Sequence, residues 1–189
     1  MKHKIHIFGA SGSGTTTISK VISGKLGYSH FDVDDYFWMR TENPYAVERS
    51  VDERQLLIQN ELLSCDEWIL SGSLCGWGDM FIEYFDLVVF VYVPRGIRLE
   101  RLRKREFERY GDKILDGGER YDASKEFIDW AAAYDEGTRN GRSLPMHKKW
   151  LKTISCPIVR IVNDALLDDS VNRVLSAILD GDLPPAAAS

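Results

Sequence analysis

A glycine-rich loop between a predicted strand and a predicted helix constrains this chain more than any other feature. Lys4–Phe8 alternates apolar and polar residues, as a short strand does, and Thr16–Leu26 carries apolar residues at helical spacing before Gly27. Glycines between these elements let successive backbone N–H groups turn toward one centre, and the helix adds the positive end of its dipole there. We therefore expect an anion-binding site at residues 9–16.

The loop itself reads GASGSGTT and fits the phosphate-binding pattern G-x-x-x-x-G-K-[ST] everywhere except at Thr15, where the pattern has lysine. Thr16 is expected to reach a Mg²⁺ ion held against the phosphates, and Ser11 and Ser13 to add hydroxyl donors. Replacing lysine removes a charged contact worth about 1.5–3 kcal/mol, so nucleotide binding or transfer weakens unless another cation compensates. The expected nucleotide-binding residues are Gly9, Ser11, Gly12, Ser13, Gly14, Thr15, Thr16 and Thr17. The alternative is a glycine-rich turn without a ligand.

An acidic cluster, DVDD, ends the second predicted strand. If that strand runs through Val33, Asp32 and Asp34 share one face and Val33 points into the core. The end of this strand lies beside the phosphate loop (residues 9–16), at the edge of the sheet where ligands collect. We expect Asp32 to support the metal and Asp34 to orient or deprotonate an acceptor, with Asp35 as a rival for either role. A solvated acidic turn is the alternative.

Three aromatic residues, Tyr36, Phe37 and Trp38, follow the acids, and they either wall a substrate pocket or pack in the core.

Strands and helices alternate along the chain, which favours an α/β fold with a mostly parallel sheet. The predicted strands are Lys4–Phe8, Tyr28–Val33, Trp68–Leu70, Leu87–Val93 and Pro157–Val162. The predicted helices are Thr16–Leu26, Val51–Leu63, Ile97–Tyr110, Ser124–Tyr134 and Ser170–Leu179. Residues 95–150 contain no predicted strand, and we expect a helical lid there. Residues 1–182 form one predicted domain, and residues 183–189 a disordered tail.

The loop, its helix and the Asp-x-Asp-Asp cluster resemble the adenylate kinase and shikimate kinase group of P-loop small-molecule kinases. The combination GSGTTT, DVDDYFW and SGSLCGWGD is also similar to bacterial proteins described as adenylate-kinase-like or ATP-binding. The resemblance implies a three-layer P-loop NTPase fold, with about five parallel strands, helices on both faces and a helical lid insertion. It also implies Mg²⁺ at Asp32 and the acceptor at Asp34. The segment from Ser71 to Trp77 lacks the Asp-Gly-x-Pro-Arg of adenylate kinases, which puts AMP as acceptor in doubt.

Arginines crowd the predicted helix Ile97–Tyr110, where Arg98, Arg101 and Arg105 share a face. In the kinases that this chain resembles, the matching helix leads into the lid, and its arginines neutralise the transferred phosphoryl group. The resemblance therefore makes Arg101 and Arg105 candidate catalytic residues, and either can replace the missing lysine charge. The alternative is a solvated helix with acid–base pairs. Arg139 and Arg142 lie at the far end of the lid-like stretch and are further candidates to face phosphate, although nothing in the pattern fixes their geometry.

Composition sets the limits on partners. A net charge of −5 disfavours nucleic acid, no apolar run is long enough to cross a bilayer, and three scattered cysteines indicate free thiols in a reducing cytoplasm. We expect a cytoplasmic monomer or homodimer that acts on a small molecule or nucleotide, without membrane or nucleic-acid partners. A nucleic-acid-modifying kinase is a remote alternative.

The sequence therefore predicts an ATP- and Mg²⁺-dependent phosphotransferase with a small metabolite, nucleoside or nucleotide as acceptor. The second hypothesis is a nucleotide-binding switch or weak ATPase with little kinase activity, and Thr15 is the residue that favours it.

Overall fold

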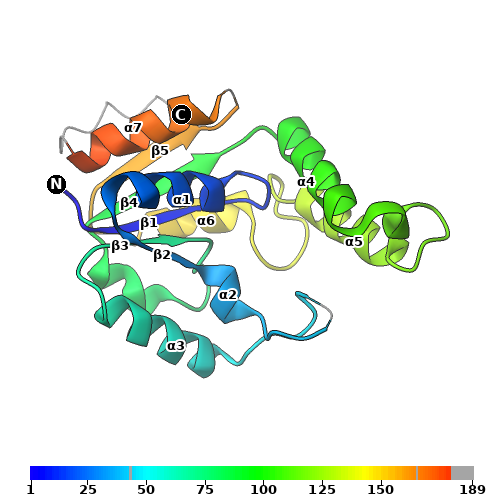
Figure 1. Cartoon of the computed structure of the whole chain (residues 1–189), viewed down its shortest axis with the longest axis horizontal. Coiled ribbons are helices and arrows are strands. Elements are labelled where there is room, and N and C mark those ends of the chain that lie inside the picture. The colour runs from blue at the N-terminus through cyan, green and yellow to red at the C-terminus, as the bar shows by residue number, and fades with distance from the viewer. Residues whose placement is uncertain (43, 165, 180–189) are drawn as a thin grey trace.

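Five parallel strands form the central sheet of the computed structural model, which describes residues 1–42, 44–164 and 166–179 (Figure 1). The strands are β1 (Lys4–Gly9), β2 (Ser29–Asp32), β3 (Trp68–Ser71), β4 (Leu87–Tyr92) and β5 (Ile158–Val162). Their order is β2-β3-β1-β4-β5, so the connections leave β1 in opposite directions. The carboxyl ends of parallel strands share one edge, and the reversal beside β1 is where open α/β sheets bind ligands.

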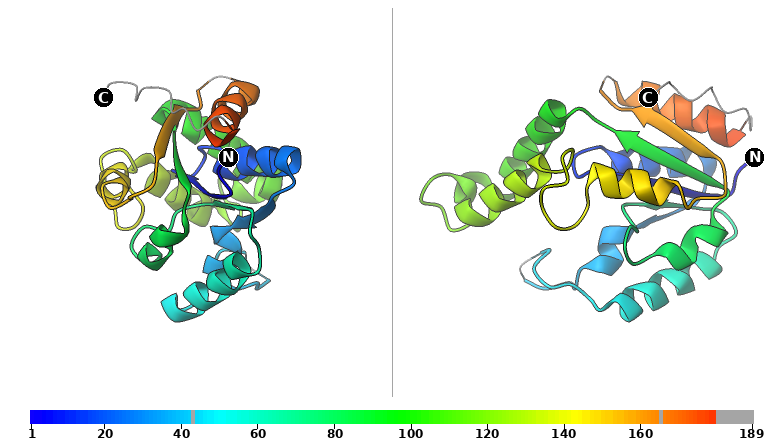
Figure 2. Two further views of the ribbon diagram at one scale, coloured as in Figure 1. Left: turned by 90° about the vertical axis from the view of Figure 1, so that its left-hand side faces the viewer. Right: turned by 180° about the vertical axis from the view of Figure 1, so that it is seen from behind.

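Helices cover both faces of the sheet, as the sequence predicts. Figure 2 shows α1 (Thr15–Leu26) and α7 (Leu167–Leu179) on one side and α6 (Leu144–Leu151) on the other. The second side also carries α3 (Val51–Leu63) and the short 3₁₀ helix η1 (Asp79–Tyr84). The architecture is the three-layer α/β fold expected from the alternating pattern.

Alternation along β1 explains why both faces need a cover. Ile5 and Ile7 pack with α1 and α7, whereas Phe8 packs with α3 and α6 through side chains such as Ile58 and Trp150. Leu87–Tyr92 is buried along almost its whole length, which confirms the interpretation of that apolar run as a strand covered on both faces.

A helical arm projects from the carboxyl edge of the sheet (Figure 1). It consists of α4 (Arg95–Tyr110), the 3₁₀ helix η2 (Gly111–Ile114) and α5 (Tyr121–Ala132). Leu99, Leu102 and Ala131 form a small core between its helices. The stretch 95–150 lacks strands, as expected, but its last helix, α6, packs Trp150 and Leu151 into the sheet core. Closure of the helical arm over a ligand stays a prediction.

The second strand is shorter than predicted. It ends at Asp32, and Val33–Phe37 forms the short helix α2. The reason is local: Asp32 is the N-cap of α2 and accepts a hydrogen bond from the Asp34 N–H group at 3.1 Å. Val33 is buried, as expected, but from the first turn of a helix.

Three further short helices, η1, η2 and α6, were not expected from the sequence. The predicted tail, residues 183–189, lies outside the described residues. No helix within the described ranges is both long enough and apolar enough to span a membrane.

Candidate active site

The phosphate loop joins β1 to α1 with the backbone that its glycines permit. Gly14 has φ 85° and precedes α1, in a left-handed conformation that favours glycine. Gly9 packs so closely that a Cβ atom there would lie 2.3 Å from the Val91 carbonyl oxygen. Glycine is therefore needed at the two ends of the motif for different reasons: at Gly14 for its backbone conformation and at Gly9 for lack of space.

Contacts with the end of β5 fix the loop. The Asn163 Nδ2 atom donates to the Ser13 carbonyl oxygen at 2.8 Å, and the Ser170 hydroxyl donates to Asn163 Oδ1 at 3.3 Å. Asn163 is buried. Asn163 therefore anchors the phosphate loop, a role that no local signal in the sequence indicated.

The first turn of α1 is open to an anion. No side chain among the described residues caps this helix, and no acidic residue lies in its first turn. The first amides of a helix lack intrahelical acceptors, and the helix dipole favours negative charge there. Ser11, Thr15 and Thr16 are partly exposed and Thr17 is exposed, but Ser13 is fully buried. The Ser13 hydroxyl has no hydrogen-bond partner among the described residues, and its donation to a ligand stays a prediction.

Thr16 and Asp32 meet at the base of this turn. The Thr16 hydroxyl donates to Asp32 Oδ2 at 2.7 Å, while Asp32 Oδ1 accepts from the Asp34 N–H group. The two residues predicted to support a metal therefore touch. Within the described residues, no three His, Cys, Asp or Glu side chains form a metal-binding group. Mg²⁺ commonly uses one or two carboxylates together with water and phosphate oxygens, so one carboxylate and one hydroxyl fit it.

Asp34 lies one residue into α2 and carries a raised pKa. Burial is the main cause, and the neighbouring carboxylates Asp32 and Asp35 add to it. Arg142 and Arg105 lie close enough to lower the pKa against those effects. A carboxylate with a raised pKa is suited to accept a proton from an attacking hydroxyl.

The arginines of α4 divide into different roles. Arg105 is exposed and is one of the two cations that lower the pKa of Asp34, and its catalytic role stays a prediction. Arg101 is partly buried, and its side chain makes no ion pair with any described residue. Arg142, between α5 and α6, is the larger of the two cationic influences on Asp34. The sequence identified Arg142 only as a residue open to phosphate, because nothing in the pattern fixed its position.

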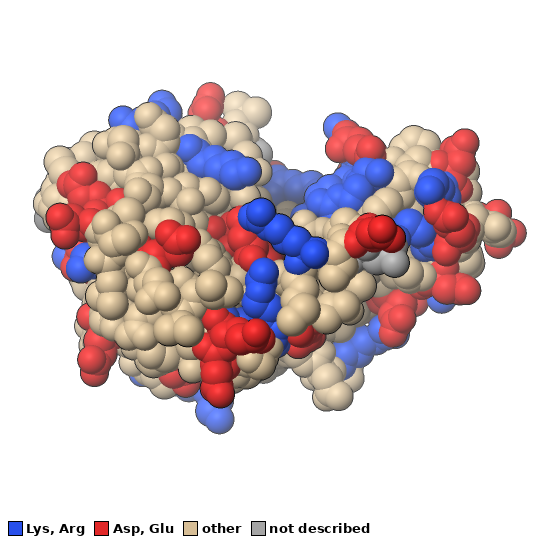
Figure 3. Space-filling model, turned by 60° about the horizontal axis from the view of Figure 1, so that its bottom comes forward, with Lys and Arg blue, Asp and Glu red and all other residues tan. Residues whose placement is uncertain are grey.

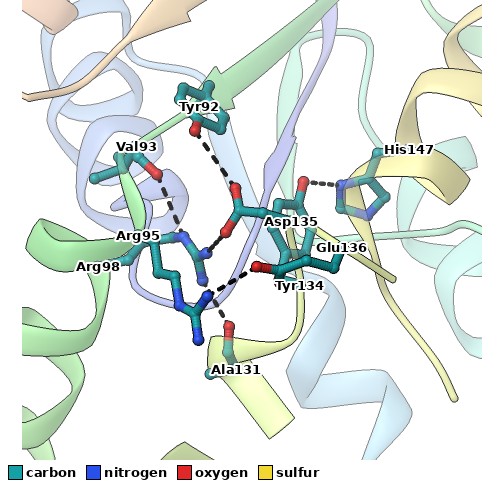
Figure 4. Close-up of polar contacts among 9 residues, drawn as sticks. All are labelled: Tyr92, Val93, Arg95, Arg98, Ala131, Tyr134, Asp135, Glu136 and His147. Atoms are coloured by element: carbon teal, nitrogen blue, oxygen red, sulfur yellow. Dashed lines mark hydrogen bonds and ion pairs between the residues drawn. The ribbon is translucent and has the colours of Figure 1, made fainter. Parts of the chain in front are cut away.

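Arg98 is not available to a ligand, although helical spacing grouped it with Arg101 and Arg105. Its buried guanidinium pairs with Asp135 and donates to the carbonyl oxygens of Ala131 at 3.0 Å and Val93 at 3.3 Å (Figure 4). The backbone of α4 still reaches the site, because a Cβ atom on Gly12 would lie 2.9 Å from the Arg98 carbonyl oxygen. Arg98 therefore holds the base of the helical arm next to the phosphate loop.

The residues after α5 tie the helical arm to the rest of the fold. The Tyr134 hydroxyl lies 2.8 Å from His147 Nδ1 on α6, and Glu136 pairs with Arg95 at 2.8 Å (Figure 4). His147 Nε2 in turn lies 3.0 Å from the Ser73 hydroxyl, in the loop after β3. Burial lowers the pKa of His147 to about 3, so the ring is neutral at ordinary pH.

Two arginines hold α2, and with it Asp34, in place. Arg49 donates from Nη1 to the carbonyl oxygens of Asp35, Tyr36 and Trp38 at the end of α2. Arg54 lies 3.7 Å above the Phe37 ring. Of the three aromatic residues that were predicted either for a pocket wall or for the core, Phe37 has its ring covered by Arg54, and Tyr36 packs against the core. Nothing in the sequence pattern distinguishes Arg49 and Arg54 from ordinary solvated residues.

A hollow separates the sheet from the helical arm (Figure 3). Basic side chains gather along it, and acidic side chains lie on its inner wall. A cleft with both signs of charge is suited to a polyphosphate accompanied by a metal ion.

Comparison with known proteins agrees with this geometry. A protein-family profile described as AAA domain matches residues 5–126, which include the phosphate loop, Asp32, Asp34 and α4. The chain belongs to this AAA-domain family. YqaC of Bacillus subtilis, an uncharacterized protein, is 45% identical over 175 residues, which cover 93% of this chain and 97% of YqaC.

Other relatives of this AAA-domain chain are kinases. The cytidylate kinase of Archaeoglobus fulgidus is 30% identical over 118 residues, or 54% of this chain and 62% of that kinase. The shikimate kinase of Bacteroides thetaiotaomicron shares the fold, with a TM-score of 0.58, 20% identity and coverage of 95% of this chain and 99% of that one. The chain therefore shares sequence similarity with a nucleotide kinase over part of its length and the fold of a small-molecule kinase over nearly all of it.

Proposed function

We propose that this chain is a phosphotransferase that moves the γ-phosphoryl group of ATP to a small acceptor in the presence of Mg²⁺. The observation that carries the proposal is the contact between Thr16 and Asp32 at the uncapped start of α1. It brings a hydroxyl and a carboxylate together beside free helix amides, and Asp34 lies in the first turn of α2, just after Asp32.

Each residue has a physical task in this proposal. The amides at the start of α1 bind the phosphates, while Thr16 and Asp32 hold Mg²⁺, which neutralises charge on the phosphate oxygens. Asp34 orients the acceptor and takes the proton from an attacking hydroxyl, as the new P–O bond forms and the bond to ADP breaks. Arg101 and Arg105, on the helical arm, and Arg142, in the loop before α6, contribute positive charge because the phosphate loop itself lacks a lysine.

The acceptor is a nucleoside monophosphate or a hydroxylated small metabolite. Cytidylate kinase, shikimate kinase and gluconokinase among the related proteins and folds define the first compounds to test. Partly buried Asp34 beside Arg142 favours an acceptor that presents a hydroxyl or phosphate oxygen next to an anionic group.

The test is a product assay with Mg-ATP and separate acceptors: CMP, the other nucleoside monophosphates, shikimate and gluconate. We expect ³¹P NMR to show ADP and a phosphorylated acceptor in equal amounts with one of them. Asp34→Asn should slow product formation by about 10²–10⁴-fold, while Asp112→Asn, on the exposed η2 segment, should not. Absence of product with every acceptor, together with no heat of Mg-ATP binding, would contradict the proposal.

Thr15 supports a second candidate, a nucleotide-binding switch or weak ATPase. The lysine position of the phosphate pattern is threonine, so the loop lacks the cation that usually contacts the terminal phosphates. Thr15→Lys tests this. A large gain in ATP affinity with no acceptor product from either chain favours the switch, whereas acceptor phosphorylation by the native chain excludes it.

A further inference from the structure

Two aromatic residues on α5 stack along the helical arm. Phe127 and Trp130 are three residues apart, about one helical turn, and their ring centroids lie 6.2 Å apart with an interplanar angle of 22°. Both are partly exposed. They pack against the small core of the helical arm, and part of each ring remains at its surface.

Each ring carries an arginine from a different segment. The guanidinium of Arg105, on α4, lies 5.9 Å from the Phe127 centroid, and that of Arg142, in the loop before α6, lies 5.5 Å from the Trp130 centroid. Guanidinium groups are attracted to aromatic faces at such distances. Arg105 and Arg142 are also the two cations that act on Asp34. Each of the two stacked rings thus contacts one of the two cations of the candidate active site.

The rings have fixed positions relative to the sheet. The Trp130 indole N–H group donates to the Asn140 carbonyl oxygen at 3.0 Å, which ties the loop that carries Arg142 to α5. Gly141, with φ 95°, lies against the same indole. The end of α5 is anchored by Tyr134 and Asp135 (Figure 4). Long arginine side chains otherwise lose considerable rotamer entropy when they are held in one orientation.

We propose that Phe127 and Trp130 form an aromatic platform that positions Arg105 and Arg142 toward Asp34 and the bound substrates. The inference rests on the proposed phosphotransferase function and deepens it. Phe127 and Trp130 are positioning residues that act through the two guanidinium groups. With threonine in place of the loop lysine, preorganised arginines become the main fixed cations at the site.

The first test measures the arginines directly and needs no acceptor. In ¹⁵N NMR spectra, the Nε–H resonances of Arg105 and Arg142 are assigned with Arg105→Lys and Arg142→Lys. We expect Trp130→Leu to shift the Arg142 resonance and reduce its heteronuclear NOE, and Phe127→Leu to do the same for Arg105. Trp130→Phe keeps a ring face and should retain most of the parental Arg142 signal. Unchanged arginine signals in both leucine variants would overturn the platform.

A matched control lies on α4. Phe107 is exposed, and among the described residues it makes no ring or cation contact, so Phe107→Leu should leave both arginine signals unchanged. Thermal unfolding of each variant identifies loss of fold, and because each leucine variant tests its own arginine, one folded variant is enough to support or overturn the platform.

The second test uses turnover once an acceptor is known, or Mg-ATP hydrolysis before that. We expect each platform leucine variant to lower kcat about three- to tenfold, with KM for Mg-ATP within about twofold of the parent. Equal kcat in parent and variants would overturn the positioning role. If the arginine signals change but the parent chain transfers no phosphate to any acceptor, the proposed function fails and the platform stands.

Discussion

Asp135 accepts an ion-paired hydrogen bond from Arg98, a side chain with no exposed surface, at the base of the helical arm. Removing one member of a buried pair leaves the other charged and without compensation. We therefore expect Asp135→Ala to lower the free energy of unfolding by about 3–5 kcal/mol. Urea denaturation at neutral pH measures the change.

The adjacent residue supplies the control for this prediction. Glu136 pairs with Arg95, and about half of each side chain is exposed, 51% and 49% respectively. Exposed pairs contribute about 0–1 kcal/mol, so Glu136→Ala should change stability by no more than that. Equal losses in the two variants would show that the burial of Arg98 does not matter.

Thr16→Val tests the proposed metal support. Valine keeps the shape of threonine and removes the hydroxyl that contacts Asp32. We expect affinity for Mg-ATP, measured by calorimetry, to fall about tenfold, while affinity for ATP in the presence of EDTA changes little. Thr138→Val, an exposed substitution between α5 and α6, is the control. A loss of affinity that is equal with and without Mg²⁺ would assign the hydroxyl to phosphate contact instead.

Asp34→Asn should separate catalysis from stability. As the proposed base, Asp34 contributes about 10²–10⁴-fold to kcat, and the variant should lose that factor with little change in KM for Mg-ATP. Because burial raises the pKa of Asp34, its ionised form opposes folding at neutral pH, so the variant should also be more stable there. Steady-state kinetics and urea denaturation check both. A less stable variant would mean that the Asp34 carboxylate holds the fold together.

The buried His147 should make the fold less stable as the pH falls. Its pKa is about 3 in the folded chain and 6.5 as a free group, so between these values the unfolded chain binds the proton. Stability should fall as pH falls from 6.5 toward 3, by about 2 kcal/mol at about pH 5 for this residue. His147→Gln should reduce the difference in stability between about pH 7 and 5 by that amount.

His6 provides an internal check on this prediction. It is fully buried, and burial lowers its pKa to about 3 as well, so some acid lability should persist in His147→Gln. Urea midpoints across the pH range measure both residues. An unchanged pH dependence in His147→Gln would show that the ring is not kept neutral by the fold.

Local sequence patterns correctly predicted the elements whose structure is determined by residues close to one another in the sequence. The strand–loop–helix unit around Gly9 and the strand Leu87–Tyr92 are confirmed, because glycine punctuation and apolar periodicity determine them. The same reasoning extended the second strand too far, because it gave Val33 a strand position. The hydrogen bond from the Asp34 amide to the Asp32 side chain instead caps a helix that begins at Val33.

Long-range contacts explain what the sequence did not predict. Helical spacing correctly grouped Arg98 with Arg101 and Arg105, but it gave no sign that Asp135 would bury the first of them. Arg142 lies near Asp34 only because α5 and α6 bring the loop between them to the carboxyl edge of the sheet. A single sequence shows which residues share a helix face, but it does not show which distant residues pack against that face.

The hydrogen bond from Asn163 to Ser13 spans 150 residues. The phosphate loop near the start of the chain is thus held by a residue that directly follows β5. A ribosome must synthesise nearly all of the described polypeptide before the loop acquires this anchor. A growing chain that already exposes the glycine motif therefore lacks this anchor until β5 has joined the sheet.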